Sequence, residues 1–386
     1  MARADPVKSD ADLPARVYND RAMRKIWRDA LDKVTPYEAG PPLEQVEKEL
    51  GLSSVIRLSA NESPLGPSPK VAESLRREAE RVHLYPDGGS QRVRAALGEW
   101  VGVEPAWLVV GNGADELIGF LARAAFGPGD EVVVPHPSFE PYSTEALLAG
   151  ADVVKSPLRN YETDLDDMRA RVTARTKAVF ICTPHNPAST IVRNGPLLRF
   201  IKSLAADAPL VVVDEAYRDF CDDPESPDGV ALAREFPFVI ALRTFSKIAG
   251  LAGLRIGYAV AQPEIIDRLN RVRAPYNVNR LAQVAAVAAL DDRPHLDRTR
   301  AHILAERPKL AAALRERGSI VPPSQANFLL VKVDARAGVL RQALLKTGIL
   351  VRDGAGIGFP GHLRVSIGTT AANARLLEVW DRTLGA

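Results

Sequence analysis

Short apolar runs that alternate with helical segments are the feature that most constrains the fold of this chain. The runs lie at 107–110, 131–134, 152–155, 177–182, 210–213, 238–241 and 255–260. Leu210-Val211-Val212-Val213 is apolar at every position, and a strand without a polar side is buried on both faces of its sheet. The pattern therefore predicts an α/β fold in which helices cover both faces of a mostly parallel sheet.

The pattern changes after Pro263. Helices are expected at about 265–273, 279–291, 297–317, 339–347 and 372–383, and strands near 320 and at 328–333, 350–351 and 363–367. Pro308 is expected to break or kink the longest helix, because proline lacks the N–H of a helical hydrogen bond. A chain of 386 residues is long for one core, so we expect an N-terminal arm over residues 1–55, a large domain over 56–262 and a small α+β domain over 263–386.

The arm carries two helical patterns. Apolar positions between 23 and 30 predict a helix over 20–31, and 43–50 predicts a short helix that ends at Gly51. Residues 1–20 are polar, of mixed charge and without the apolar core of a signal peptide, so we expect a flexible leader there.

Composition argues against several classes of function. The net charge of +2 gives no reason to expect binding of nucleic acid or of an anionic membrane, and no apolar run approaches the roughly 20 residues of a membrane-spanning helix. The six histidines are scattered, so no metal site is expected. Two cysteines indicate no disulfide framework, and we expect a cytoplasmic protein in a reducing compartment.

Lys247 is the candidate reactive residue, because it stands just beyond a buried strand among hydroxyls and small residues. Burial disfavours the charged form of an amine and makes it a nucleophile, and its typical use is a Schiff base, above all with pyridoxal phosphate (PLP). Thr244 and Ser246 can donate hydrogen bonds to a phosphate, and Arg255 can clamp it. A lone lysine in a glycine-rich loop is more often a surface residue, so this interpretation depends on its partners.

Polar residues at other strand ends supply these partners, because ligands of parallel sheets collect at the carboxyl ends of the strands. Asp214 suits the pyridine nitrogen of PLP, which a carboxylate keeps protonated. Asn186 and Tyr217 can hydrogen-bond the phenolic oxygen. The turn Gly111-Asn112-Gly113 presents backbone N–H groups to a phosphate, although it lacks the third glycine of a dinucleotide fingerprint. Each residue alone also fits a turn or a helix cap, but together they predict a PLP site in which Lys247 binds the cofactor and moves a proton.

The chain resembles the fold-type I PLP-dependent aminotransferases and, within them, the histidinol-phosphate aminotransferase family. The resemblance extends from Pro36-Tyr37 to Arg364. The blocks that carry it are Asn61-Glu62-Ser63-Pro64, Tyr85-Pro86-Asp87, Gly113-Ala114-Asp115-Glu116, Asn186-Pro187, Asp214-Glu215-Ala216-Tyr217, Arg243-Thr244-Phe245-Ser246-Lys247, Gly253-Leu254-Arg255-Ile256-Gly257, Gln325-Ala326-Asn327-Phe328 and Leu363-Arg364-Val365.

This resemblance implies further roles. The backbone amides of Ala114 and Asp115 would hold the phosphate of PLP together with Ser246 and Arg255. Tyr85, which spacing alone marks as a turn residue, would reach the PLP phosphate of a neighbouring subunit. That role implies a homodimer, with the N-terminal arm packed on the small domain and on the partner.

Substrate contacts are also implied by the resemblance. Arg364 would bind the substrate anion, and Arg352 and Asn327 would make further contacts. Tyr37 and Asn61 would line the pocket. A guanidinium suits this task, because its planar fork matches a carboxylate or a phosphate.

Three positions depart from the family pattern. Phe139 stands where some members have a tyrosine that stacks on the PLP ring, so stacking is kept and a hydroxyl is lost. His185 replaces a common asparagine, and Ala188-Ser189 replaces the usual Thr-Gly.

The implied reaction is transamination of L-histidinol phosphate with 2-oxoglutarate, giving imidazole acetol phosphate and glutamate in histidine biosynthesis. One alternative is an aromatic amino-acid (phenylalanine) aminotransferase, toward which Phe139 leans. A second is a PLP-dependent decarboxylase of a phosphorylated amino acid. A sensor or scaffold without activity is disfavoured by the intact set of Lys247, Asp214 and Tyr217.

Overall fold

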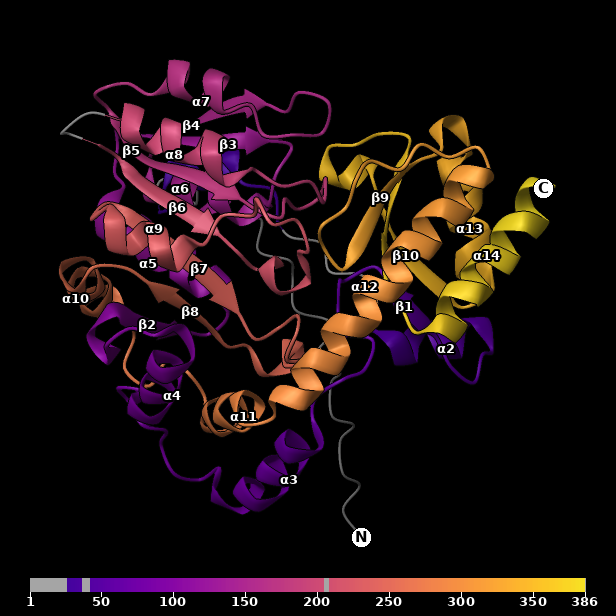
Figure 1. Cartoon of the computed structure of the whole chain (residues 1–386), viewed down its shortest axis with the longest axis horizontal. Helices are drawn as coiled ribbons and strands as arrows, with labels where there is room; N and C mark the ends of the chain where they lie inside the picture. Colours follow the sequence, from indigo (N-terminus) through magenta and orange to yellow (C-terminus); the bar gives the residue numbers. More distant parts are fainter. Residues whose placement is uncertain (1–25, 37–41, 205–207, 386) are drawn as a thin grey trace, which may run out of the picture.

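Two sheets, one of seven strands and one of four, organise the chain (Figure 1). The computed structural model describes residues 26–36, 42–204 and 208–385. The leader expected over residues 1–20 and the predicted site residue Tyr37 lie outside the described residues.

The larger sheet has the strand order β2-β8-β7-β6-β5-β3-β4. Its strands are β2 (Leu108–Gly111), β3 (Glu131–His136), β4 (Asp152–Pro157), β5 (Thr176–Cys182), β6 (Leu210–Asp214), β7 (Val239–Thr244) and β8 (Gly257–Val260). In this sheet β8 runs antiparallel to β2 and β7, and every other neighbouring pair is parallel. The predicted mostly parallel sheet is therefore confirmed. Because β8 runs the opposite way, it begins at the edge where the other strands end.

Helices cover both faces of this sheet. On one face lie α5 (Ala114–Ala125), α6 (Glu140–Ala149) and α10 (Pro263–Val272), and on the other α7 (Leu165–Arg171), α8 (Asn194–Ser203) and α9 (Gly229–Glu235). Val212 of β6 packs with the first group, whereas Val211 and Val213 pack with the second. This alternation explains why the strand has no polar side.

The smaller sheet has the order β1-β10-β11-β9, so it joins the two ends of the sequence. Its strands are β1 (Ile56–Leu58), β9 (Phe328–Lys332), β10 (Ile349–Asp353) and β11 (His362–Ser366), and α13 (Ala337–Lys346) and α14 (Thr370–Leu384) accompany it. The strand expected near Ile320 is wrong, since Ile320 makes only an isolated bridge to Lys332.

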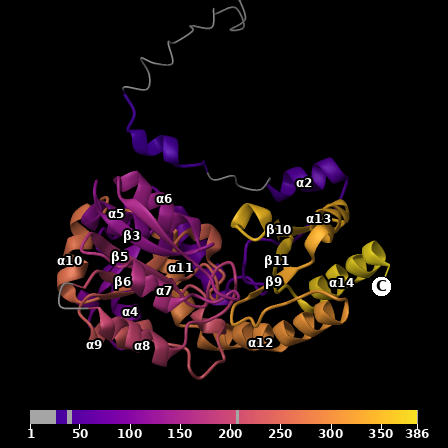
Figure 2. The ribbon, with the colours of Figure 1, turned by 90° about the horizontal axis from the view of Figure 1, so that it is seen from above.

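The long helix α12 (Arg293–Glu316) connects the two parts (Figures 1 and 2). It contacts α11 (Arg280–Leu290) and the short helix η5 (Arg218–Phe220) on one side, and β9 and α14 on the other. The sequence predicts a break or a kink at Pro308, and the break is wrong, because the helix continues through the proline. Ile303 and Leu310 on either side of the proline are buried in the core, and their packing keeps the helix whole.

The remaining helices bear on the expected domain limits. α10 packs on α5, and α11 packs on α3 (Pro69–Glu78) and α4 (Gln91–Val101). α2 (Leu43–Leu50) has the predicted bounds and ends at Gly51. The division of the chain at residues 55 and 262 stays a prediction. β1, just after residue 55, pairs with β10 in the smaller sheet, and α10 and α11, just after residue 262, pack on helices that precede it.

The helix expected over residues 20–31 differs from the structure. Within the described part of that range, residues 26–28 are not helical, and Asp29–Lys33 forms the 3-10 helix η2. Ile26 and Trp27 are exposed there, although η2 contacts α6, so these two apolar side chains are not buried against the described part of the chain.

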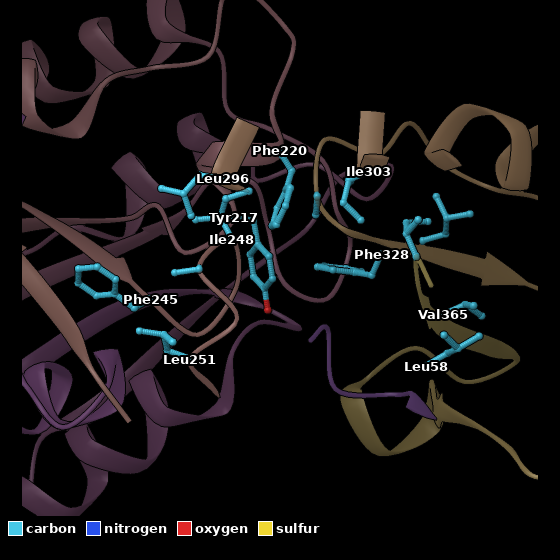
Figure 3. Packing of buried hydrophobic residues seen from close by; sticks show 14 of the residues in the cluster. Leu58, Tyr217, Phe220, Phe245, Ile248, Leu251, Leu296, Ile303, Phe328 and Val365 are labelled. Carbon is cyan, nitrogen blue, oxygen red and sulfur yellow. The ribbon is translucent and has the colours of Figure 1, made fainter. Parts of the chain in front are cut away.

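One apolar cluster runs from the larger sheet to the smaller (Figure 3). It contains Tyr217 and Phe245 on the larger side, and Leu58, Phe328 and Val365 on the smaller. The ring of Tyr217 meets that of Phe328 edge-on, with centroids 5.1 Å apart. Side chains from both sheets therefore meet around Tyr217. None of the helices described combines the length and the apolar character needed to cross a lipid bilayer.

Candidate active site

The sheet topology brings the predicted strand-end residues to one edge of the larger sheet. Asp214 ends β6, Lys247 follows β7, and Asn186 follows β5. Ala114 begins α5 at the end of β2, and Arg255 precedes β8, which starts at this edge. Residues from position 114 to position 255 thus gather at one end of the sheet, as in other open α/β sheets.

Lys247 is half-buried at this edge. It donates a hydrogen bond to the carbonyl oxygen of Ala60 at 3.3 Å and lies 5.5 Å from the ring centre of Tyr217. Burial, and next the positive charge of Arg364, lower the pKa of Lys247 to about 8. A larger fraction of this amine is therefore neutral and nucleophilic near neutral pH than for a solvated lysine.

Asp214 is buried, with 2% of its surface exposed. The hydroxyl of Tyr142 donates to Oδ2 at 2.6 Å, and the backbone N–H of Ala216 donates to Oδ1 at 3.0 Å. Burial raises the pKa of Asp214 to about 6, although both hydrogen bonds oppose this rise. No lysine or arginine among the described residues forms an ion pair with this carboxyl group, and a protonated ring nitrogen would supply a cationic partner.

Tyr142 is a member of the site that the sequence did not reveal. It lies 72 positions before Asp214, within a helix segment whose spacing marks it only as a core residue. Phe139, at the start of the same helix, is half-buried and meets the ring of Tyr142 edge-on at 5.5 Å.

An anion cradle lies at the start of α5. Gly113 is the N-cap residue of this helix and has a φ of 87°. It makes no side-chain hydrogen bond to the N–H groups of the first turn. A Cβ atom at Gly113 would overlap the guanidinium of Arg255. Arg255 donates to Asp115 Oδ2 at 2.9 Å and to Ser246 Oγ at 3.4 Å, and Ser246 N–H donates to Thr244 Oγ1 at 3.1 Å. Helix N–H groups, two hydroxyls and an arginine form a set of donors suited to a phosphate.

These groups match the three functional parts of PLP. Lys247 offers an amine to an aldehyde, Asp214 offers a carboxylate to a ring nitrogen, and the cradle at Gly113 offers hydrogen-bond donors to a phosphate. The described residues contain no group of three or more histidine, cysteine or acidic side chains arranged to bind a metal ion.

Asn61 joins Tyr217 to the smaller sheet. Its Nδ2 donates to the hydroxyl of Tyr217 at 3.2 Å, and its carbonyl oxygen accepts from Asn327 Nδ2 at 3.0 Å. Burial raises the pKa of Tyr217 to about 12, so this phenol keeps its proton at neutral pH.

Two predicted arginines face each other across neighbouring strands. Arg352 of β10 pairs with Arg364 of β11 in the antiparallel register, and residues directly opposite project from the same face of a sheet. Arg364 donates to Asn186 Oδ1 at 2.7 Å and to the carbonyl oxygen of Ser59 at 2.8 Å. This pair therefore concentrates positive charge beside Asn186.

Tyr85 is separate from the strand-end residues. It is 78% exposed, stacks on Tyr276 with ring centroids 4.7 Å apart, and accepts a hydrogen bond from Arg280 through its backbone oxygen. In the part of the chain that the structure describes, it makes no hydrogen bond or ring contact with Lys247 or Arg255.

His185 is buried and neutral in the loop after β5. It is 1% exposed, its Nδ1 accepts from the backbone N–H of Ala188 at 3.3 Å, and burial lowers its pKa to about 3. Ala188 packs with Leu330 and Phe359 of the smaller part. The departures from the family pattern at 185 and 188 thus lie in a loop that packs against the smaller sheet.

Comparisons with known proteins agree with this geometry. Residues 53–379 match the model of the family "Aminotransferase class I and II". A histidinol-phosphate aminotransferase from an Anaeromyxobacter species is 44% identical over 92% of this chain and 97% of its own length. A second, from Moorella thermoacetica, is 44% identical over 91% of each chain.

A solved structure agrees as well. The crystal structure of histidinol-phosphate aminotransferase from Sinorhizobium meliloti, in complex with pyridoxal-5'-phosphate, has a TM-score of 0.84, 26% identity, and coverage of 93% of this chain and 97% of that one. The expected fold-type I architecture is confirmed by this likeness. The chain belongs to the class I and II aminotransferase family, among the histidinol-phosphate aminotransferases.

Proposed function

We propose that this chain is a PLP-dependent aminotransferase that moves the amino group of L-histidinol phosphate to 2-oxoglutarate. The products are imidazole acetol phosphate and glutamate, and the reaction belongs to histidine biosynthesis in the cytoplasm. The names of the relatives, at 44% identity over more than nine-tenths of the chain, support the choice of substrate.

The observation that carries this proposal is the pair Arg352 and Arg364 on neighbouring strands. A phosphate monoester is a strongly charged anion at neutral pH and accepts hydrogen bonds through three oxygens. Two guanidinium groups on one face can engage such an anion from two sides. The same pair serves a carboxylate of 2-oxoglutarate in the second half-reaction. A neutral aromatic side chain needs no second arginine.

The residues of this chain divide the work at the cofactor. When bound, PLP supplies an electron sink for the bonds at the substrate Cα. Lys247 carries the proton between that Cα and the carbonyl carbon of the cofactor, as a general base and then a general acid. Asp214 keeps the ring nitrogen protonated, and Asn186 and Tyr217 hydrogen-bond the phenolic oxygen.

The other predicted residues bind and orient. Those assigned to the PLP phosphate are Ala114, Asp115, Thr244, Ser246 and Arg255. Phe139 covers one face of the ring, and Tyr37, Asn61 and Asn327 line the substrate pocket. The buried position of Asn327 and its hydrogen bond to Asn61 support a role for both in shaping the pocket wall.

A homodimer completes the proposed site. Tyr85 is assigned to the PLP phosphate of the partner, and its exposed phenol supports an action outside its own subunit. Two more large apolar side chains nearby, Val82 and Leu84, are also exposed, and an interface between two copies would bury them.

Steady-state kinetics test the substrate. We expect kcat/KM for histidinol phosphate to exceed that for phenylalanine by at least about 100-fold, since a phosphate bound by two arginines contributes several charge-assisted hydrogen bonds. Arg352→Leu should remove most of this preference while changing turnover of phenylalanine little. Equal kcat/KM for the two donors would overturn the substrate assignment in favour of an aromatic aminotransferase. Release of carbon dioxide without 2-oxoglutarate would instead indicate a decarboxylase.

A further inference from the structure

The smaller sheet holds a serine whose hydrogen bonds fix the direction of a proton at the cofactor site. We propose that Ser366 is a positioning residue that acts through Asn61 and makes the Tyr217 hydroxyl a hydrogen-bond donor toward the phenolic oxygen of the cofactor. This inference depends on the proposed assignment of Tyr217 to that oxygen.

The three side chains form a continuous buried chain. Ser366 Oγ lies 3.0 Å from Asn61 Oδ1, and Asn61 Nδ2 lies 3.2 Å from the Tyr217 hydroxyl. The exposed fractions are 2% for Ser366, 1% for Asn61 and 4% for Tyr217. Water therefore has little access to these hydrogen bonds, and each polar atom has to be satisfied by its neighbours.

Two hydrogen bonds at Ser366 set the direction of the protons. The backbone N–H of Asn61 donates to Ser366 Oγ at 2.9 Å, and the serine hydroxyl donates its own proton to Asn61 Oδ1 at 3.0 Å. The amide oxygen of Asn61 is thereby held on the serine side, and the NH₂ group faces Tyr217. An amide NH₂ can only donate, so the Tyr217 hydroxyl accepts there, and its own proton is left for another acceptor.

The backbone holds Asn61 in this place. Its φ is 55°, in the left-handed region that asparagine tolerates better than most residues. Asn327 Nδ2 donates to the Asn61 carbonyl oxygen at 3.0 Å. Asn61 is therefore fixed by hydrogen bonds at its N–H, its carbonyl oxygen and its side chain.

Ser366 also places these hydrogen-bonded side chains near the arginine assigned to the substrate anion. It lies two residues after Arg364 on β11, and residues two apart on a strand share a face. One strand thus carries both the group assigned to the substrate anion and the serine that orients the tyrosine hydroxyl.

The test is a pH titration of the visible absorption of the PLP-loaded enzyme without substrate. A donor to the phenolic oxygen stabilises its anionic form and keeps the midpoint of this titration low. We expect Ser366→Ala to raise the midpoint by about 0.3–1 pH unit, as the weakening of one neutral hydrogen bond implies. Tyr217→Phe should raise it further.

The decisive comparison is the double variant. If Ser366 acts through Tyr217, Ser366→Ala should add no further shift in a Tyr217→Phe background. Ser366→Thr, which keeps the hydroxyl, should restore the wild-type midpoint. An unchanged midpoint in Ser366→Ala, or an equal shift with and without Tyr217, would overturn the proposal.

Two further variants complete the test. The first is a control for the loss of a buried hydroxyl, and the second reverses the hydrogen bond between residue 61 and Tyr217. Ser156 of β4 is 1% exposed, and its hydroxyl donates to Asp167 Oδ2 at 2.6 Å. Ser156→Ala therefore removes a comparable buried hydroxyl and should leave the midpoint unchanged. Asn61→Asp keeps the shape but offers Tyr217 an acceptor, which draws its proton away from the cofactor. Its midpoint should rise at least as far as in Tyr217→Phe, and a midpoint at the wild-type value would contradict the proposal.

The titration also separates this inference from the proposed substrate. It contains no amino donor, so its outcome does not depend on histidinol phosphate. A midpoint shift in Ser366→Ala together with poor turnover of histidinol phosphate would overturn the substrate proposal and leave the positioning role intact.

Discussion

At the scale of single residues, burial acts on the two central charges of the site in complementary ways. It lowers the pKa of Lys247 to about 8 and raises that of Asp214 to about 6. Each group is thereby moved toward its neutral form, and each gains from a partner that the folded chain alone does not supply. An aldehyde reacts with the neutral amine of Lys247, and a cationic ring nitrogen stabilises the ionised form of Asp214.

The lowered pKa of Lys247 can be measured in the cofactor-free protein. We expect its rate of acylation by a neutral amine-reactive reagent to reach half its maximum near pH 8, because only the neutral amine reacts. The same lysine in the urea-unfolded chain is the control, and should titrate near the ordinary value of 10.5. Peptide mass spectrometry follows the single site. Identical profiles in the two states would refute the effect of burial.

The raised pKa of Asp214 predicts a pH-dependent stability. In the cofactor-free protein the unfolded carboxyl ionises near 3.8 and the folded one near 6, so stability from this group is present at low pH and is lost as pH rises through that window. Asp214→Asn removes this loss. Its stability relative to wild type should rise by on the order of 1 kcal/mol between pH 5 and pH 8.

Urea unfolding of both proteins at the two pH values measures this difference. The contributions of all other titrating groups to the free energy of unfolding cancel, because both proteins contain them. The same variant should bind PLP more weakly, because the ring nitrogen loses its anionic partner. A relative stability that does not change with pH would show that Asp214 is not the group responsible.

At the scale of elements, the start of α5 controls the phosphate cradle. Gly113→Ala places a methyl group against the Arg255 guanidinium, at a φ of +87°. We expect the affinity for PLP, measured by fluorescence titration of the cofactor-free protein, to fall by about 10- to 100-fold as the arginine is displaced.

Gly129→Ala is the matched control for this change. Gly129 has a φ of +89°, and a Cβ there meets no atom within 4 Å. Both positions have a positive φ, at which an alanine is strained, but only the change at Gly113 reaches the cradle. Equal loss of affinity in both variants would mean that strain, not the displaced arginine, is the cause.

The sequence predicts the elements better than it predicts their partners. Each run between 107 and 260 became a strand of the larger sheet, and for the strands inside the sheet burial on both faces leaves a pattern within four to six residues. The antiparallel direction of β8 and the pairing of β1 with β10 have no such local pattern, since both depend on contacts between distant segments. The helix α12 is unbroken at Pro308 for the same reason, because packing on both sides of the proline outweighed a local rule.

The same limit applies within the candidate site. Asp214, Asn186 and Lys247 were predictable because chemistry at the ends of successive strands meets at one edge. Tyr142 and Ser366 reach Asp214 and Asn61 across 72 and 305 positions, and neither stands in a pattern that distinguishes it from a core residue. Only the folded chain brings Tyr142 and Ser366 to these partners.

At the scale of the whole molecule, the proposed homodimer predicts complementation between subunits. Lys247→Ala lacks the reactive amine, and Tyr85→Ala lacks the phenol assigned to the partner's site. In a mixed dimer, the site that keeps Lys247 receives Tyr85 from the other subunit and is complete. Random mixing should therefore restore about a quarter of wild-type activity per subunit, because half of the dimers are hybrids with one complete site each.

This assay is run at a PLP concentration at which the Tyr85→Ala dimer alone is mostly cofactor-free. Subunits are exchanged by mild dissociation, and analytical ultracentrifugation verifies the dimer. Activity equal to the mean of the two parents would place Tyr85 in its own subunit's site, or outside any site.

The most direct test of the central claim is reduction of the PLP-loaded protein with borohydride, followed by digestion and peptide mass spectrometry. Reduction makes the bond between an amine and the cofactor permanent. One pyridoxyl phosphate group should be found per chain, on the peptide that contains Lys247. A stoichiometric adduct on another lysine, or a protein that carries no adduct after incubation with PLP, would contradict the assignment of Lys247 and the site built around it.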